Sequence, residues 1–168
     1  MGFKLTTLQQ TFILPSDPGA KGGWDDAKDD LVEWLEYATD YFRQKGLQPT
    51  LHDILYLPSD ARFLLSATSG LAGFAVSYAF ETNDHATLEK AKAALSALAD
   101  TLWETFRGRV YLVKNVCAKP ETLAAMYGEN ASAFFALKRE VDPEGVLRNG
   151  FLERTFPGSC NKDVESGS

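Results

Sequence analysis

Lys114 is the ionisable residue whose sequence context most favours chemistry. It ends the apolar run Val110-Tyr111-Leu112-Val113, where a fully buried ammonium would be costly but one facing an electron-rich cofactor or a substrate hydroxyl would be useful. The simpler interpretation is an exposed lysine at the end of a strand. Tyr111 lies three residues earlier, so a regular strand would turn the two side chains to opposite faces. A bulge, or the end of the strand after Val113, would be needed to bring both to one site.

Hydrophobic periodicity predicts the elements that must position this segment. Short apolar runs predict four strands, at residues 8–14, 52–57, 73–81 and 109–114. Apolar residues at helical spacing predict a helix over residues 31–45, capped by Asp29 or Asp30, and a second over 87–106. Pro120 then opens further helices at its favoured first position. This order predicts an α+β, ferredoxin-like (split βαβ) four-stranded antiparallel sheet, with both helices on one face and additional C-terminal helices.

Alternation along the third strand separates a helix-facing side from an uncovered side. The large side chains of Phe74, Val76, Tyr78 and Phe80 share one side, and Ala75, Ser77 and Ala79 share the other. By the same alternation we place on the uncovered side Gln9, Thr11, Tyr56, Arg109 and Tyr111. The expected result is a concave polar floor with aromatic walls. Such a face could be solvated, or it could receive a ligand or another domain, and its small residues favour the second possibility.

Charge and composition exclude several classes of function. The 168 residues include 23 acidic and 17 basic side chains, for a net charge of −6, which opposes a surface that follows nucleic-acid phosphates. No apolar run reaches the roughly 18 residues that a membrane helix needs, and the N-terminus lacks a signal-peptide pattern, so we predict a cytoplasmic protein. We expect one domain over residues 1–156 and a flexible tail over 157–168.

The sequence offers neither a metal motif nor a phosphate cradle. His52 and His85 are far apart, and Cys117 and Cys160 lack the spacing of metal ligands. The glycines of GAKGGW and SGLAG lack the strand-to-helix setting that holds a pyrophosphate. We therefore predict no metal site, and we expect this chain alone not to bind a dinucleotide tightly.

Several short patterns resemble a known family. The first predicted strand reads Leu8-Gln9-x-x-Phe12, and the fourth contains Tyr111-x-x-Lys114. The downstream segment carries Ala125-Met126-Tyr127, then Lys138-Arg139, then Asp142-Pro143. Together with the whole run from Gly108 to Phe156, these patterns resemble the C-terminal cap, or substrate, domain of vanillyl-alcohol oxidase-type FAD-linked oxidases. The resemblance is nearest to the decaprenylphosphoryl ribose oxidase and aldonolactone oxidase branches.

The resemblance implies a ferredoxin-like cap whose open sheet face covers a flavin ring. Tyr111 and Lys114 would be catalytic residues beside flavin and substrate, with Lys114 also contacting the cofactor. The substrate, a small sugar-like molecule, would be bound by Gln9, Thr11, Tyr56 and Ser77. The cofactor would be FAD, held mainly by a separate FAD-binding domain or subunit, because the glycine-rich phosphate loops of such a domain do not occur in this sequence. The implied activity is oxidation of a sugar, polyol or aldonolactone hydroxyl by hydride transfer to flavin, and the chain alone would be inactive.

Other functions stay open. The chain has Tyr56 where the decaprenylphosphoryl ribose oxidase branch carries a lysine, and only Lys114 remains of the His-Trp-Gly-Lys motif of the aldonolactone oxidase branch. The substrate is therefore open among sugars, polyols and aldonolactones. A standalone ferredoxin-like module that forms a homodimer or binds a ligand through its open face is one alternative, and an inactive remnant is another.

Overall fold

The computed structural model describes residues 5–16 and 23–157, with side chains described from residue 28 onward in the second range. Within these ranges the elements are β1 (Thr6–Pro15), α1 (Gly23–Gln44), β2 (Leu51–Leu57), β3 (Gly73–Thr82), α2 (His85–Phe106), β4 (Arg109–Val110), α3 (Pro120–Val141) and α4 (Gly150–Thr155). The strands form one sheet in the order β2-β3-β1-β4, and all neighbours are antiparallel. This order confirms the predicted α+β, ferredoxin-like fold. Beyond Pro157, the predicted tail and Cys160 lie outside the described residues.

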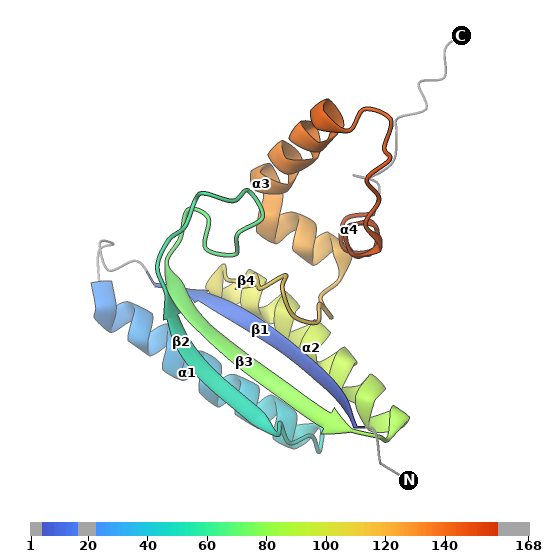
Figure 1. Cartoon of the computed structure of the whole chain (residues 1–168). Coiled ribbons are helices and arrows are strands. Elements are labelled where there is room, and N and C mark those ends of the chain that lie inside the picture. The colour runs from blue at the N-terminus through green and yellow to red at the C-terminus, as the bar shows by residue number, and fades with distance from the viewer. Residues whose placement is uncertain (1–4, 17–22, 158–168) are drawn as a thin grey trace.

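Helices α1 and α2 lie against one face of the sheet (Figure 1). The loop of residues 58–72, α3 and α4 lie at the end of the molecule where β4 is found (Figure 1). Among the residues that the structure describes, no helix runs along the opposite face of β1 and β3, which we call the open face (Figure 1).

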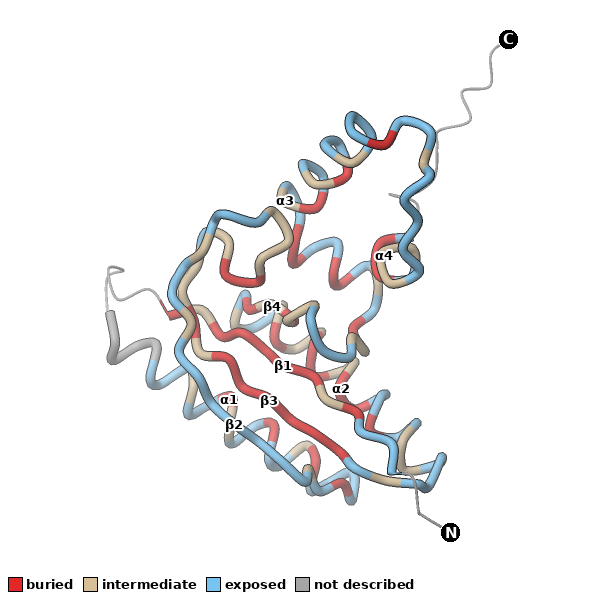
Figure 2. The backbone as a smooth tube through the Cα atoms, viewed as in Figure 1, coloured by how far each residue is buried: buried red, intermediate tan, exposed pale blue. Residues whose placement is uncertain are grey.

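The main core fills the space between the sheet and the helices α1 and α2. Val76, Tyr78 and Phe80 of β3 point into it and are buried. Trp34 of α1 packs on Phe12 of β1, with ring centroids 5.2 Å apart. The stripe that α2 presents to the sheet is fully buried, and it consists of Ala91, Ala94, Leu95, Leu98, Ala99 and Leu102. Burial is concentrated along β1 and β3, whereas the edge strand β2 is exposed (Figure 2).

Local signals explain the two ends of α2. Asp84 caps its start, because its carboxylate accepts a hydrogen bond from Thr87 N at 2.9 Å. Arg107 ends it in the left-handed conformation, at φ 54°. Gly108 follows, and only a glycine fits there, because a Cβ would collide with the Ile13 carbonyl oxygen and the Leu102 side chain. Because of this close approach, β4 begins immediately after the end of α2.

Two predicted boundaries were wrong. Helix α1 begins at Gly23, ahead of the predicted cap at Asp29 or Asp30, because a polar segment can be helical before its apolar face begins. Strand β4 ends at Val110 rather than at residue 114. Tyr111 N still donates to Thr11 O at 2.9 Å, but residues 112–114 then form a turn, and Asn115 N returns to Gln9 O at 3.0 Å. The fourth strand is thus interrupted where Tyr111 and Lys114 were expected to share it.

Candidate functional site

The floor of the candidate site is the open face of β1 and β3. Register places Thr11 opposite Ser77 and Gln9 opposite Ala79, so these residues share one face. The Thr11 and Ser77 hydroxyls are 2.8 Å apart and buried, and they bond to each other. The alternation argument therefore placed Gln9, Thr11 and Ser77 correctly. One hydroxyl donates to the other, so the pair forms a polar floor that keeps one O–H donor.

Tyr56 does not lie on this floor, and its predicted placement was wrong. It pairs with Phe74, and the two rings lie 5.8 Å apart on the face that carries α1 and α2. The β2 residues opposite Ser77 and Ala75 are Asp53 and Leu55. The sequence could not fix this register, because β2 carries apolar side chains on both of its faces.

One end of the open face is covered by the loop of residues 58–72. Ala67 and Leu71 of this loop pack against Ile13 and Ala75 of the sheet, and Tyr111 joins the same apolar cluster. Beside this cluster lies a hollow of about 770 Å³, whose walls include Phe63, Tyr111, Val113, Phe134 and Leu137. At its rim, hydrogen bonds from Arg62 hold the pKa of Asp60 at about 2. The hollow is therefore mainly apolar, and Tyr111 stands between it and the floor.

Arg109 fixes that loop to the rest of the molecule. Its Nη1 donates to Ser69 O at 2.6 Å, and its Nε donates to Met126 O at 3.0 Å. Its guanidinium also lies over the Tyr127 ring, 5.9 Å from the centroid. Partial burial lowers the pKa of this guanidinium. Arg109 thus joins the loop, the open face and the part of α3 just before its kink at Gly128. The sequence placed Arg109 on the open face but gave no sign of this role.

Lys114 lies in a different environment from Tyr111. It is exposed, and it lines a second hollow of about 440 Å³ that does not include Tyr111. The turn at residues 112–114 stands between the two residues, and Val113 at its tip is 71% exposed. The strand ends as the shared-site hypothesis required, yet the two side chains line separate hollows. Asn115, which sequence reasoning missed, anchors the turn because its Oδ1 accepts from Gln9 N at 2.8 Å.

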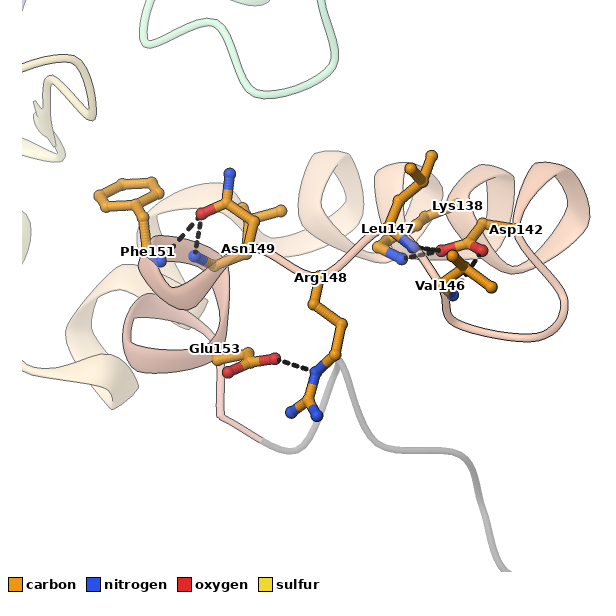
Figure 3. Close-up of polar contacts among 9 residues, drawn as sticks. Lys138, Asp142, Val146, Leu147, Arg148, Asn149, Phe151 and Glu153 are labelled. Carbon is orange, nitrogen blue, oxygen red and sulfur yellow. Dashed lines mark hydrogen bonds and ion pairs between the residues drawn. The ribbon is translucent and has the colours of Figure 1, made fainter.

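The C-terminal segment is held by a buried carboxylate. Asp142 accepts from Lys138 Nζ at 2.7 Å and from the backbone N–H groups of Val146 and Leu147 (Figure 3). The hydrogen bond from Lys138 is the main reason that the pKa of Asp142 is lowered. Asn149 then caps α4, because its Oδ1 accepts from Phe151 N at 2.9 Å (Figure 3). The segment that begins at Asp142-Pro143 is therefore a structured joint between α3 and α4.

In the part of the chain that the structure describes, no group of three or more His, Cys, Asp or Glu side chains gathers as a metal site would require. Among the described helices, none has the length and apolar character to cross a membrane. Burial raises the pKa of the Cys117 thiol to about 11, so this thiol stays protonated near neutral pH.

Part of the chain matches the model of a known protein family. Residues 76–155 match the D-arabinono-1,4-lactone oxidase family. The matched stretch runs from within β3 through α2, β4 and α3 to the end of α4. This match supports an FAD-linked oxidase C-terminal domain and does not select a branch of those enzymes. A comparison with curated proteins found no match.

The described residues fit one side of a flavin better than a complete cofactor site. The part of the floor that the loop does not cover carries the small side chains of Ser77 and Ala79, which suit a flat ring placed against the sheet. One of the Thr11 and Ser77 hydroxyls donates to the other, so one O–H donor is left for a bound group. Tyr111 stands beside the floor, whereas Lys114 lines the separate hollow.

Proposed function

We propose that this chain is the substrate, or cap, domain of an FAD-dependent oxidoreductase that oxidises a hydroxyl of a sugar, polyol or aldonolactone. The observation that carries the proposal is the match of residues 76–155 to the D-arabinono-1,4-lactone oxidases, in a sheet whose open face is floored by small residues. FAD, held mainly by a separate domain or subunit, supplies the hydride acceptor. The aldonolactone oxidase and decaprenylphosphoryl ribose oxidase branches remain the nearest models for the substrate. We place the domain in residues 1–156 and the enzyme in the cytoplasm.

Apart from Tyr56, which lies on the helix-covered face, each predicted site residue has a task in this proposal. The buried floor of Thr11 and Ser77 excludes water from one side of the substrate. Tyr111, packed against the loop of residues 58–72, walls the pocket and offers its phenol to a substrate hydroxyl. Gln9 is held at the open end of the floor by its backbone bonds to Asn115 and orients the substrate. Lys114, an exposed residue next to Asn115 in the chain, brings a positive charge beside the flavin or orients the reacting hydroxyl.

The proposal is tested by reconstitution. The purified chain is titrated with FAD, and separately with an isolated FAD-loaded domain of a D-arabinono-1,4-lactone oxidase, while flavin absorbance and complex size are followed. We expect binding only to the loaded domain, with a perturbed flavin spectrum, and then turnover of a sugar alcohol or aldonolactone. In the active assembly, Lys114→Ala should lower kcat at least tenfold without unfolding the cap, and Lys90→Ala is the control on an exposed α2 lysine. Absence of any complex contradicts the proposal, and near-normal turnover by Lys114→Ala removes that residue's role.

One observation favours a second function, a self-associating module that needs no flavin. The edge strand β2 is exposed along almost its whole length and carries Leu51, Ile54, Leu55 and Tyr56. An exposed apolar edge is a template for pairing with another strand, including that of a second copy. A stable homodimer at micromolar concentration that dissociates on Ile54→Lys, together with no binding to the loaded domain, would favour this function over the first.

A further inference from the structure

The hollow that contains Lys114 is distinct from the hollow beside Tyr111. It lies between α2, the segment of residues 114–118, the start of α3 and α4, and its volume is about 440 Å³. Its lining brings together Leu8 of β1, Lys92 of α2, Lys114, Leu123 of α3 and Arg154 of α4. Segments far apart in the sequence therefore meet at one concave surface.

The lining is strongly one-sided in charge. It includes Lys92, Lys114 and Arg154 and no aspartate or glutamate, although acidic residues outnumber basic ones in this chain by 23 to 17. Lys92 has one counter-charge, since its Nζ lies 2.7 Å from Glu89 Oε1. Neither Lys114 nor Arg154 forms an ion pair with any other residue that the structure describes. Two uncompensated cations and one partly compensated cation thus converge on one hollow.

The remaining polar groups add donors without adding negative charge. The Oδ1 of Asn115 is occupied by Gln9 N, which leaves the NH2 group of the same amide as a donor. The Cys117 thiol stays protonated because it is partly buried, so it contributes no thiolate. Leu8, Leu123 and Phe151 supply an apolar floor beside the cations. A ligand that fits this lining carries a compact negative charge and a less polar remainder.

We propose that this hollow is a binding site for the phosphate group of a small metabolite. Arginine presents a planar fork that suits a tetrahedral oxyanion, and the two lysines add point charges. The volume exceeds what one phosphate group occupies, so it also accepts part of the group to which the phosphate is attached. Lys114 is shared with the proposed oxidation, but Lys92 of α2 and Arg154 of α4 have no part in it. The inference therefore does not depend on a flavin-binding partner.

The test uses the full isotopically labelled chain without flavin. Inorganic phosphate, glucose 6-phosphate and acetate are titrated at constant ionic strength, and backbone amide shifts are followed by NMR. We expect saturable shifts that centre on residues 115–118 and 151–155 for both phosphates, with acetate at least fivefold weaker. Arg154→Gln and Lys114→Gln should each weaken phosphate binding about fivefold, the size expected when a largely exposed ionic contact is lost.

Arg148→Gln is the matched control. It removes one positive charge from the neighbouring segment, but Arg148 is paired with Glu153 at 2.9 Å and does not line the hollow. Its affinity for phosphate should stay within twofold of the unmodified chain. The proposal is overturned if the amide shifts do not saturate, or if they spread equally over the exposed lysines Lys45 and Lys90. It is also overturned if acetate binds as tightly as phosphate, or if Arg154→Gln and Arg148→Gln have the same affinity for phosphate. If glucose 6-phosphate binds at least as tightly as inorganic phosphate, the result supports a phosphate group carried by a metabolite. If glucose 6-phosphate does not bind, the site takes free phosphate, and the metabolite part of the proposal is overturned.

Discussion

On the face of the sheet that meets α1 and α2, the side chains of β1 and β3 are large and mostly apolar, with the buried Gln10 as the polar exception, whereas the open face of β3 carries small residues. The first face is held mainly by ring and aliphatic packing, as in the contact of Phe12 with Trp34. The second is held by the Thr11–Ser77 pair, by the contacts of Arg109 and by one small apolar cluster around Ile13. The helix-covered face therefore carries most of the stability of the domain. Substitutions on the open face should therefore cost less stability, as is typical of surfaces that bind other molecules.

The largest effect should come from the helix-covered face. Leu98→Ala removes a fully buried side chain of α2 and leaves a cavity, so the free energy of unfolding should fall by about 2–5 kcal/mol. Leu55→Ala, on the open side of the exposed strand β2, should cost about 0.5 kcal/mol or less. Urea denaturation followed by circular dichroism measures both. Equal losses of unfolding free energy in the two variants would contradict the view that the helix-covered face carries most of the stability.

Arg109→Met should produce the next largest effect. The variant keeps an apolar stem but loses the hydrogen bonds to Ser69 O and Met126 O, so each carbonyl loses a charged donor. We expect a loss of about 2 kcal/mol and faster amide exchange in residues 63–71, because the loop loses its attachment to α3. Arg139→Met, which removes an exposed guanidinium from α3, is the control and should leave exchange in that loop unchanged. A global rise in exchange, uniform over α1 and α2, would contradict a local role.

The face on which a side chain lies could be predicted from the sequence in β3 but not in β2. Alternation in β3 separated the faces because its two sets of side chains differ sharply in size, as Tyr78 and Ser77 do. It failed in β2, where Tyr56 and Leu55 are both apolar and only the pairing with β3 decides their faces.

The site was harder to predict than the fold. The end of β4 depends on the bonds between Asn115 and Gln9, which are 106 residues apart in the chain. The attachment of the loop by Arg109 likewise depends on carbonyl groups 40 and 17 residues away. Periodicity contains no information about such contacts, so the separation of Tyr111 from Lys114 and the cover over the floor could be found only in the folded chain.

The hydroxyl pair on the floor should contribute a smaller and measurable amount. Ser77→Ala leaves the buried Thr11 hydroxyl without its partner, and Thr11→Val does the same to Ser77. Each single variant should lose about 1–2 kcal/mol, and the double variant should lose less than the sum, by a coupling of about 1 kcal/mol. A double-mutant cycle from urea denaturation gives this coupling. If the losses in the free energy of unfolding are strictly additive, the two hydroxyls do not stabilise each other. The hydrogen bond between them would then contribute nothing to the stability of the open face.

The smallest expected effect concerns the joint between α3 and α4, which lies outside both faces. The pKa of Asp142 is lowered in the folded chain, so its carboxylate stabilises the fold fully above its unfolded pKa of about 4, and that contribution is lost as pH falls through the lower folded pKa. Asp142→Asn should therefore destabilise the joint at pH 7 and should flatten the loss of stability on acidification below about pH 4. Glu144→Gln, in the same turn but exposed, is the control. Amide exchange in residues 146–156, measured at several pH values, tests this prediction. If Asp142→Asn and Glu144→Gln give the same pH profile, the bonds to Val146 and Leu147 do not hold the joint. In that case α4 must be positioned by the packing of Phe156 on Tyr127 and Phe135.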